Sequence, residues 1–180
     1  MKRIAWALPL LWIASCASTP PAPTYDGPTA VLKDTVTQVA GATVAQLYFV
    51  LSIDGKEIRN AFDETYDRNR DRGPVLTAYP YQRNVPAKEA KFHLLARSYF
   101  AAPILEMTGH AYQIQGDVQF TPQAGETYVV KGELTPEHSV VWIESEKTGA
   151  RVSTMLQVNG SAEVKMFKKA LPVEQVPPGS

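Results

Sequence analysis

Apolar and polar residues alternate with a period of two through the middle of this chain. The clearest case is 112–120, where every even position holds an apolar residue or glycine and every odd position holds glutamine or aspartate. A period of two places successive side chains on opposite faces of a β-strand, so this segment is expected to bury one face. The same alternation, or a β-branched and aromatic composition, predicts strands over 45–53, 90–97, 128–134 and 139–144.

Short turn sequences separate these predicted strands. Asp54-Gly55 is a two-residue hairpin signal and leads into a strand predicted over 56–61. The tripeptide 147–149 ends in glycine and turns the chain toward another strand, predicted over 150–153. Many short strands joined in this way predict an all-β fold, a single antiparallel β-sandwich.

The predicted sandwich occupies residues 29–153, which suffice for one two-sheet core and not comfortably for two domains. The strand pattern fades in the C-terminal extension, 154–180. There Val164 and Phe167 have helical spacing, whereas Val164 and Met166 also suit a strand, and the proline-rich end predicts partial disorder. The chain has 18 basic and 18 acidic residues and is 44% hydrophobic, a balance that argues against a membrane-spanning protein and against a nucleic-acid binder.

The first sixteen residues have the layout of a secretory signal peptide. Lys2 and Arg3 give a positive start, and the apolar run 4–13 is too short to cross a bilayer core, which needs about twenty helical residues. The run ends in the sequence IASC, which resembles a bacterial lipobox. A thiolate is a nucleophile suited to forming a thioether with a diacylglyceryl group. The resemblance implies that residues 1–15 are removed and that Cys16 becomes a lipidated N-terminus.

Cys16 is the only cysteine, which excludes an internal disulfide and a zinc site built on several thiolates. An ordinary signal peptide cut after Ala17 is the competing interpretation, but it leaves the position of the single cysteine unexplained. A cysteine with two or three acyl chains holds a protein stably on a membrane. Among bacterial lipoproteins, the absence of aspartate after the cysteine implies the outer membrane, here with the domain facing the periplasm. Residues 16–28 contain four prolines and are expected to form an extended tether.

The order of turns and strands resembles that of a known family. The segments that carry the resemblance are Asp54-Gly55-Lys56, Val85-Pro86-Ala87, the stretch 124–132 and Val141-Trp142-Ile143-Glu144. In these segments the chain is similar to small bacterial envelope lipoproteins with an immunoglobulin-like or PEGA-like β-sandwich. The resemblance implies an immunoglobulin-like fold for residues 29–153 and a role in the cell envelope, and it carries over no catalytic residue.

Familiar catalytic motifs do not occur in the chain. Nucleophile elbows, H-E-x-x-H, phosphate-binding glycine loops and C-x-x-C pairs are all missing from the sequence. The three histidines are His93, His110 and His138, and no two have the spacing of metal ligands. We therefore predict a protein that is not an enzyme and that holds no cofactor and no metal ion.

The segment Asp67–Gly73 alternates acidic or amide residues with arginines. Its Asp, Asn and Asp resemble the opening of a calcium loop, but the glycine comes one residue late and Ala78 stands where a bidentate glutamate is needed. Its arginines also suit phosphates of lipopolysaccharide or of lipid headgroups, although the interleaved acids cancel much of that attraction. A solvated, mobile loop is the prediction.

Aromatic residues gather in and beside a long loop predicted over 62–84. Phe62, Tyr66, Tyr79 and Tyr81 lie in or beside it, and Tyr99-Phe100 lie in a second stretch that is predicted to be irregular. Such rings stack on sugars or grip a partner protein. Alternatively, they close the open ends of the core. These four tyrosines are the candidate contacts for a ligand or partner.

Three classes of function follow. The preferred one is a lipid-anchored, non-catalytic structural or protein-interaction module that recruits an envelope component through its loops. The alternative is a binding protein for a glycan or a small periplasmic ligand, with the loop aromatics in the site. Trp142 is left out of that site because its place in a predicted strand assigns it to the core. A hydrolase with a site assembled from distant residues is the third and least favoured class.

Overall fold

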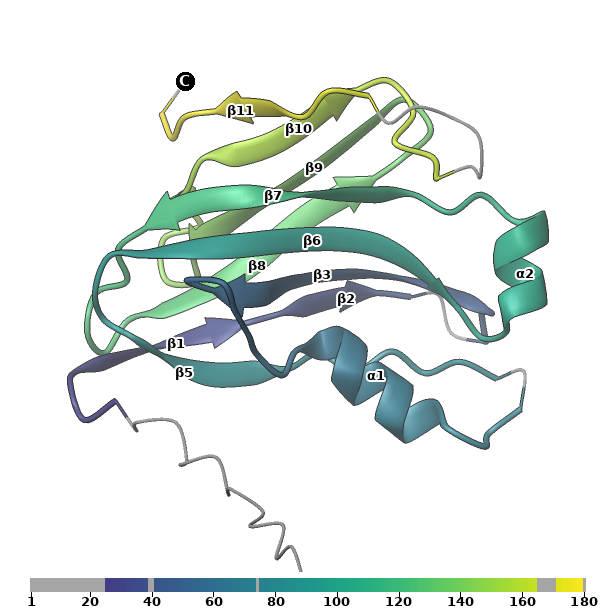
Figure 1. Ribbon diagram of the computed structural model, residues 1–180, viewed down its shortest axis with the longest axis horizontal. Helices are drawn as coiled ribbons and strands as arrows, with labels where there is room; N and C mark the ends of the chain where they lie inside the picture. Colours follow the sequence, from purple (N-terminus) through teal and green to yellow (C-terminus); the bar gives the residue numbers. More distant parts are fainter. Residues whose placement is uncertain (1–24, 39–40, 74, 165–170, 180) are drawn as a thin grey trace, which may run out of the picture.

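A computed structural model describes residues 25–38, 41–73, 75–164 and 171–179. The predicted signal peptide, Cys16 and most of the predicted tether lie outside these residues. Within them the chain is mostly β, with two sheets of mainly antiparallel strands that share an apolar core (Figure 1). The prediction of an all-β fold is confirmed at this level.

Strands and two helices make up the ordered elements of the described residues. The strands are β1 Thr29–Lys33, β2 Thr35–Thr37, β3 Val44–Ile53, β4 Lys56–Glu57, β5 Gln82–Pro86, β6 Ala90–Phe100, β7 Gln113–Phe120, β8 Thr127–Leu134, β9 His138–Ser145, β10 Met155–Asn159 and β11 Glu174–Val176, and the helices are α1 Ala61–Asn69 and α2 Pro103–Thr108. Across the described ranges, no helix has the length and apolar character needed to span a membrane.

The strands form two sheets. Sheet A has the order β11-β10-β9-β8-β1-β5, and sheet B has the order β2-β3-β6-β7 with β4 paired to β3. The pairing of β1 with β8 is parallel, which departs from the purely antiparallel sandwich that the sequence predicted. The chain passes through β2 to β7 between β1 and β8, so no hairpin joins the two strands and they are free to run in the same direction.

The core between the sheets is built from the alternating faces that the sequence predicted. Ile114 and Val118 of β7 and Val130 of β8 all lie in it. Gly132 of β8 allows the Tyr48 ring to approach closely, because a Cβ at that position would lie 2.5 Å from ring atom Cδ1. The glycine in the β8 pattern therefore makes room for a large side chain of the opposite sheet.

β3 is buried on both faces. Leu47 and Phe49, from the apolar face that the sequence predicted, pack under α1 in a second core on the outside of sheet B. Tyr48 and Val50, from the opposite face, enter the core between the sheets. Sheet B is therefore the middle layer between sheet A and α1.

Asp34 lies where the chain leaves β1 of sheet A for β2 of sheet B, and its side chain is fully buried. Arg83 of β5 binds it in a bidentate manner, with Nη2 2.6 Å from Oδ1 and Nη1 2.7 Å from Oδ2. The N–H groups of Val50 and Ala61 donate to the same carboxylate at 3.2 and 3.0 Å. Burial raises the pKa of Asp34, and the Arg83 guanidinium opposes that rise. The carboxylate thus ties both sheets to the start of α1.

A helix and a strand replace much of the loop predicted over 62–84. The strand predicted over 56–61 ends with β4, because Asn60 forms the N-cap of α1. β5 then joins the edge of sheet A beside β1. The prediction of a second irregular stretch was also wrong, since Tyr99 belongs to β6 and takes part in its pairing with β3.

Sheet A continues past Ser153, the predicted end of the sandwich domain. β10 pairs with β9 and β11 pairs with β10, so the C-terminal extension 154–180 supplies two strands, and Leu156 of β10 is fully buried. The strand predicted over 150–153 is reduced to a single bridge with β9. Phe167, part of the ambiguous pattern in the extension, lies outside the described residues.

Trp142 is half-buried on the outer face of β9, so its assignment to the core was wrong. Its neighbours Val141 and Ile143 take the inward positions and are fully buried. The indole Nε1 of Trp142 donates to Glu144 Oε2 at 3.2 Å. The strand itself was predicted, but the alternation places the tryptophan on the outside.

Candidate functional site

α1 lies on the outer face of sheet B and is fixed at its start by a capping box (Figure 1). Asn60 Oδ1 accepts hydrogen bonds from the N–H groups of Phe62 and Asp63 at 2.9 and 3.4 Å. Asp63 Oδ2 accepts one from the N–H of Asn60 at 3.1 Å. Ala61 and Thr65 are buried against the sheet side, so the helix presents Phe62 at a fixed position.

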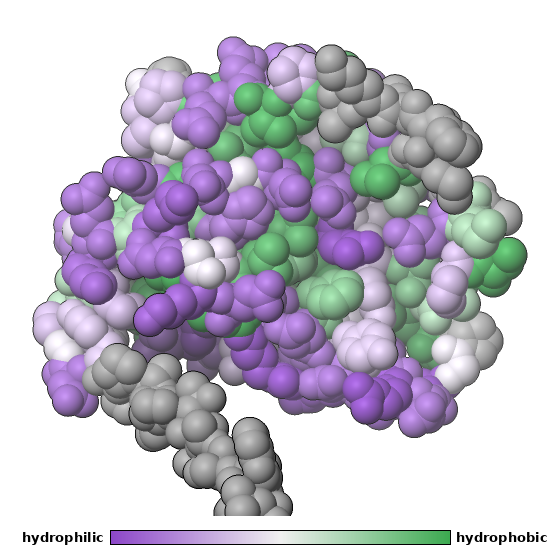
Figure 2. Space-filling view, in the orientation of Figure 1, coloured by the Kyte–Doolittle hydropathy of each residue, from purple (hydrophilic) through white to green (hydrophobic). Residues whose placement is uncertain are grey.

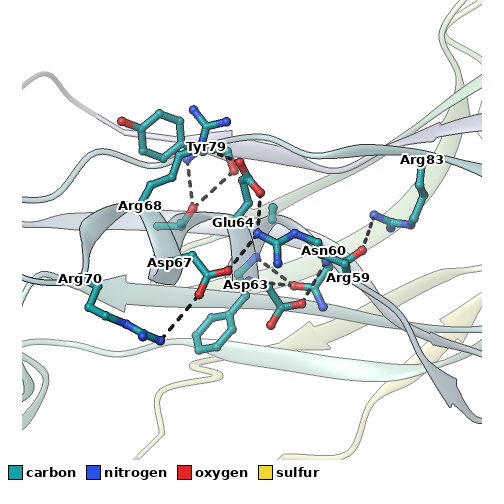
Figure 3. Close-up of polar contacts among 12 residues, drawn as sticks. Arg59, Asn60, Asp63, Glu64, Asp67, Arg68, Arg70, Tyr79 and Arg83 are labelled. Carbon is teal, nitrogen blue, oxygen red and sulfur yellow. Dashed lines mark hydrogen bonds and ion pairs between the residues drawn. The ribbon is translucent and has the colours of Figure 1, made fainter.

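A network of charged side chains covers the solvent side of α1 (Figure 3). Arg59 Nη2 lies 2.9 Å from both Glu64 Oε2 and Asp67 Oδ2, and Arg68 Nε lies 2.5 Å from Glu64 Oε1. Hydrogen bonds from Arg59 and Arg68 lower the pKa of Glu64. Arg68 also stacks on Tyr79, with Cζ 4.6 Å from the ring centroid. These charges are closely paired with one another.

The segment Asp67–Gly73 is only in part the loop that the sequence predicted, because its first residues form the last turn of α1. The Asp67 carboxylate contacts Arg59 and Arg70. In the part of the chain that the structure describes, no three histidine, cysteine or acidic side chains gather in a group that could hold a metal ion. The contacts of Asp67 thus give the calcium hypothesis no support.

A hollow of about 410 Å³ lies between α1 and α2 above the outer face of sheet B. We call it the aromatic groove. Phe62 is its central ring, with the Tyr99 centroid 5.3 Å away in an edge contact and the Tyr66 centroid 6.4 Å away in a stacked one. Its lining also includes Asn69, Arg70, Leu76, Arg97, Ala101, Pro103 and Glu106.

Two arginines of the aromatic groove stack on its rings. Arg97 Cζ lies 5.2 Å from the Phe62 centroid, and Arg70 Cζ lies 5.4 Å from the Tyr66 centroid. Cation–π contacts of this kind hold a guanidinium over a ring while its N–H groups point outward along the plane. The groove therefore combines apolar ring faces with directed hydrogen-bond donors.

The carboxylate partners of these two arginines are distant. Arg97 Nη2 lies 3.5 Å from Glu106 Oε1, and Arg70 Nη2 lies 3.8 Å from Asp67 Oδ1. Asp67 is moreover bound by Arg59 at 2.9 Å. A charge-assisted hydrogen bond from a guanidinium to a carboxylate measures about 2.7–2.9 Å. Arg70 and Arg97 are thus less well paired than Arg59.

A second hollow, of about 460 Å³, adjoins the aromatic groove along α1. Phe62 and Arg97 line both hollows, so the two meet at this pair. Phe49, Leu51 and Leu95 of sheet B form part of the second lining. Together the two hollows make a depression that follows α1 across β3 and β6.

The four candidate tyrosines separate into two sets. Tyr66 and Tyr99 lie together in the aromatic groove. Tyr79 instead packs against Arg68 on the charged side of α1, and Tyr81 packs against the second core. Burial raises the pKa of Tyr99, and the nearby Tyr66 adds to that rise. The alternative role, closing the core, describes Tyr81, and it also applies to Tyr99, which packs against the same second core.

Another hollow, of about 610 Å³, lies beside Tyr81 where the chain leaves β1 of sheet A. Two ion pairs line it, with Lys33 Nζ 2.7 Å from Glu146 and Lys131 Nζ 3.7 Å from Glu144. Tyr81 is the only one of the candidate tyrosines in its lining. Lys33 is closely paired, whereas Lys131 is paired no better than Arg97. This hollow differs from the aromatic groove because Tyr81 is the one aromatic ring in its lining.

His93 is the histidine whose surroundings come nearest to catalytic geometry. Its Nδ1 lies 2.6 Å from Asp117 Oδ1, and both belong to neighbouring positions of β6 and β7. Ser52 of β3 is paired with His93 from the other side, but the hydrogen bond of the His93 ring is to Asp117. Hydrogen bonds from His93 and Lys91 lower the pKa of Asp117, which is exposed. Ser52, His93 and Asp117 thus form a polar row across β3, β6 and β7 of sheet B.

Exposed apolar side chains gather at the end of the molecule that carries α2. Ile104 is 63% exposed and Met107 77% exposed, and Figure 2 shows hydrophobic surface at the edge where Figure 1 places this helix.

Comparison of the chain with protein-family models, with curated protein sequences and with solved structures finds no match. The function has to be argued from the groove itself.

The sequence analysis placed Phe62 among the loop aromatics and Arg70 in the segment Asp67–Gly73, but chose neither as a site residue, and it missed Arg97. The signal for Phe62 was its spacing of four from Tyr66, which places both rings on one face of a helix. No sequence signal joins Arg97 to them, because it comes from a strand and only the packing of α1 on sheet B brings it near Phe62.

Proposed function

We propose that this protein is a lipid-anchored bacterial envelope protein, without catalytic activity, that recruits a partner through the aromatic groove. The observation that carries the proposal is the meeting of three rings with two poorly paired guanidiniums in one hollow. Aromatic and arginine side chains dominate the binding energy of protein interfaces. α1 and β6 already hold Phe62 and Tyr99 in place, which reduces the entropy lost on binding.

The place of the groove suits a tethered protein. β1 begins at Thr29, which pairs with Pro86 at the end of the sandwich away from α2 (Figure 1). In this proposal the lipid on Cys16 attaches the chain near that end, through a tether of about 3.1 Å per residue in polyproline II form. The groove then faces the periplasm, away from the outer membrane that holds the lipid.

We also propose that the sandwich belongs to the immunoglobulin-like class. Two mainly antiparallel sheets packed around one core support this assignment, as do the inward-facing alternate residues of both sheets. The solution structure of the domain, with its sheet connections traced by backbone contacts, tests it. Sheet connections without the Greek-key pattern of immunoglobulin-like sandwiches would overturn it.

Site-specific photocrosslinking in intact cells tests the recruiting function. A photoreactive phenylalanine analogue at Tyr66 is expected to form a defined adduct, which mass spectrometry identifies. The control places the same analogue at the exposed Glu89, at the tether end of the sandwich. An equal adduct pattern at both positions, or none at Tyr66, would contradict the proposal.

A further inference from the structure

We infer that the aromatic groove binds a polypeptide segment in which a carboxylate side chain lies next to a large apolar one. This inference rests on the proposed function and specifies the chemistry of its partner. The carboxylate is expected to contact Arg97 and Arg70, and the apolar side chain to enter the hollow beside Phe62.

The charge of the groove favours an anionic group. Its two guanidiniums, on Arg70 and Arg97, face a single lining carboxylate, that of Glu106. The Glu106 carboxylate lies 3.5 Å from Arg97, which is beyond a good charge-assisted hydrogen bond. A ligand carboxylate is able to bind either guanidinium in a bidentate manner without breaking a close native ion pair.

The walls of the groove favour an apolar neighbour for that carboxylate. Leu76, Ala101 and Pro103 line it together with the ring faces of Phe62 and Tyr99. Its volume of about 410 Å³ falls in the range of ligand pockets, about 300–1,000 Å³. The exposed apolar residues of α2 extend the same character beyond the rim.

The hydrogen bonds of the groove favour a peptide over a glycan. A side-chain amide offers a sugar hydroxyl both a donor and an acceptor. Asn69 is the one side-chain amide in the lining, and it is already engaged. Its Nδ2 donates to the carbonyls of Thr65 and Thr77 at 2.6 and 2.7 Å, and its Oδ1 accepts from the N–H of Thr77 at 2.9 Å. The amide therefore offers little to a hydroxyl-rich ligand.

Selection from a random peptide display library against the full chain in detergent tests this inference. Enriched peptides are expected to carry Asp or Glu beside a large apolar residue. A synthetic copy of the best peptide should bind Arg97→Gln at least about tenfold more weakly than the unchanged chain, since a charge-assisted bidentate contact is lost. Binding should also weaken as salt concentration rises.

Arg68→Gln is the matched control, because Arg68 lies on the same helix but stacks on Tyr79 away from the groove. It should leave peptide affinity unchanged, and circular dichroism should show both variants folded. Enriched peptides without acids, no enrichment at all, equal losses in both variants, or tight binding only of a carboxylated oligosaccharide such as an alginate fragment would each overturn the inference. A groove-specific photoadduct together with such a result would leave the proposed function standing.

Discussion

Asp34 shows how a single residue organises this fold. Its carboxylate receives two bonds from Arg83 and one each from the backbone of Val50 and Ala61, so a strand of each sheet and a helix start meet at one buried charge. A buried ion pair gains little net stability over an apolar pair of the same shape. Removal of one partner, in contrast, leaves the other charge buried and unpaired.

Asp34→Ala is expected to lower the free energy of unfolding by about 3–5 kcal/mol, because it leaves the buried Arg83 guanidinium without its ion-pair partner. Urea unfolding followed by circular dichroism measures the change. Lys33→Ala is the control, since its neighbouring ion pair with Glu146 is exposed and should contribute less than about 1 kcal/mol. Equal losses in the two variants would show that Asp34 has no special role.

Tyr48 makes stability depend on pH in the alkaline range. Burial raises its pKa from 10 to about 12 in the folded protein, and the nearby Glu133 charge adds to the rise. The unfolded chain loses this proton near pH 10, so the stabilisation is complete below pH 10 and is lost as the pH rises through about 12. The ultraviolet absorbance of tyrosinate should show a phenol that titrates near pH 12, and Tyr48→Phe should remove both that titration and its share of the alkaline destabilisation.

α1 is the element that the sequence analysis missed and the site depends on. Its start carried a readable signal, because Asn60 and Asp63 have the spacing of a capping box. The signal was overlooked because charged residues fill much of the segment, and such composition also describes a loop. The period-two segments were predicted correctly because alternation has one simple structural solution.

Asn60→Ala should destabilise α1 by about 1 kcal/mol, the usual contribution of an N-cap side chain. Hydrogen exchange measured by mass spectrometry should show faster exchange in 61–69, with the peptides of β8 and β9 unchanged. Asn84→Ala, at an exposed position of β5, serves as the control. Uniformly faster exchange across the sandwich would contradict a local capping role.

At the scale of the whole molecule, the start of β1 and the groove lie toward opposite ends. β1 starts at one end of the sandwich and α2 lies at the other (Figure 1). The proposed lipid thus sets which surface faces the membrane, while the sheet-and-helix frame sets which surface faces a partner. The proposed anchor and the proposed partner binding can be tested separately, since a form of the protein without the lipid would keep the aromatic groove.

Cys16→Ala is expected to move the protein from the membrane fraction to the soluble fraction, because the acyl chains on that sulfur supply the proposed anchoring energy. Cell fractionation with immunoblotting measures the distribution. The Tyr66 substitution used for crosslinking is the comparison, since a change in the groove should leave the protein in the membrane fraction. Retention of the Cys16 variant on the membrane would mean that another feature holds it there.

The sequence by itself determined the strands β3, β6, β7, β8 and β9 of the core, through a period of two or a β-branched and aromatic composition, and the turns marked by glycine and proline. It also supplied the prediction of a lipid anchor at Cys16. Only the tertiary structure decided which face of β3 lies between the sheets and which lies under α1, since both faces are apolar enough to be buried. The same packing brought Arg97 of β6 to Phe62 of α1, because the chain must fold before residues so far apart in sequence can form one groove.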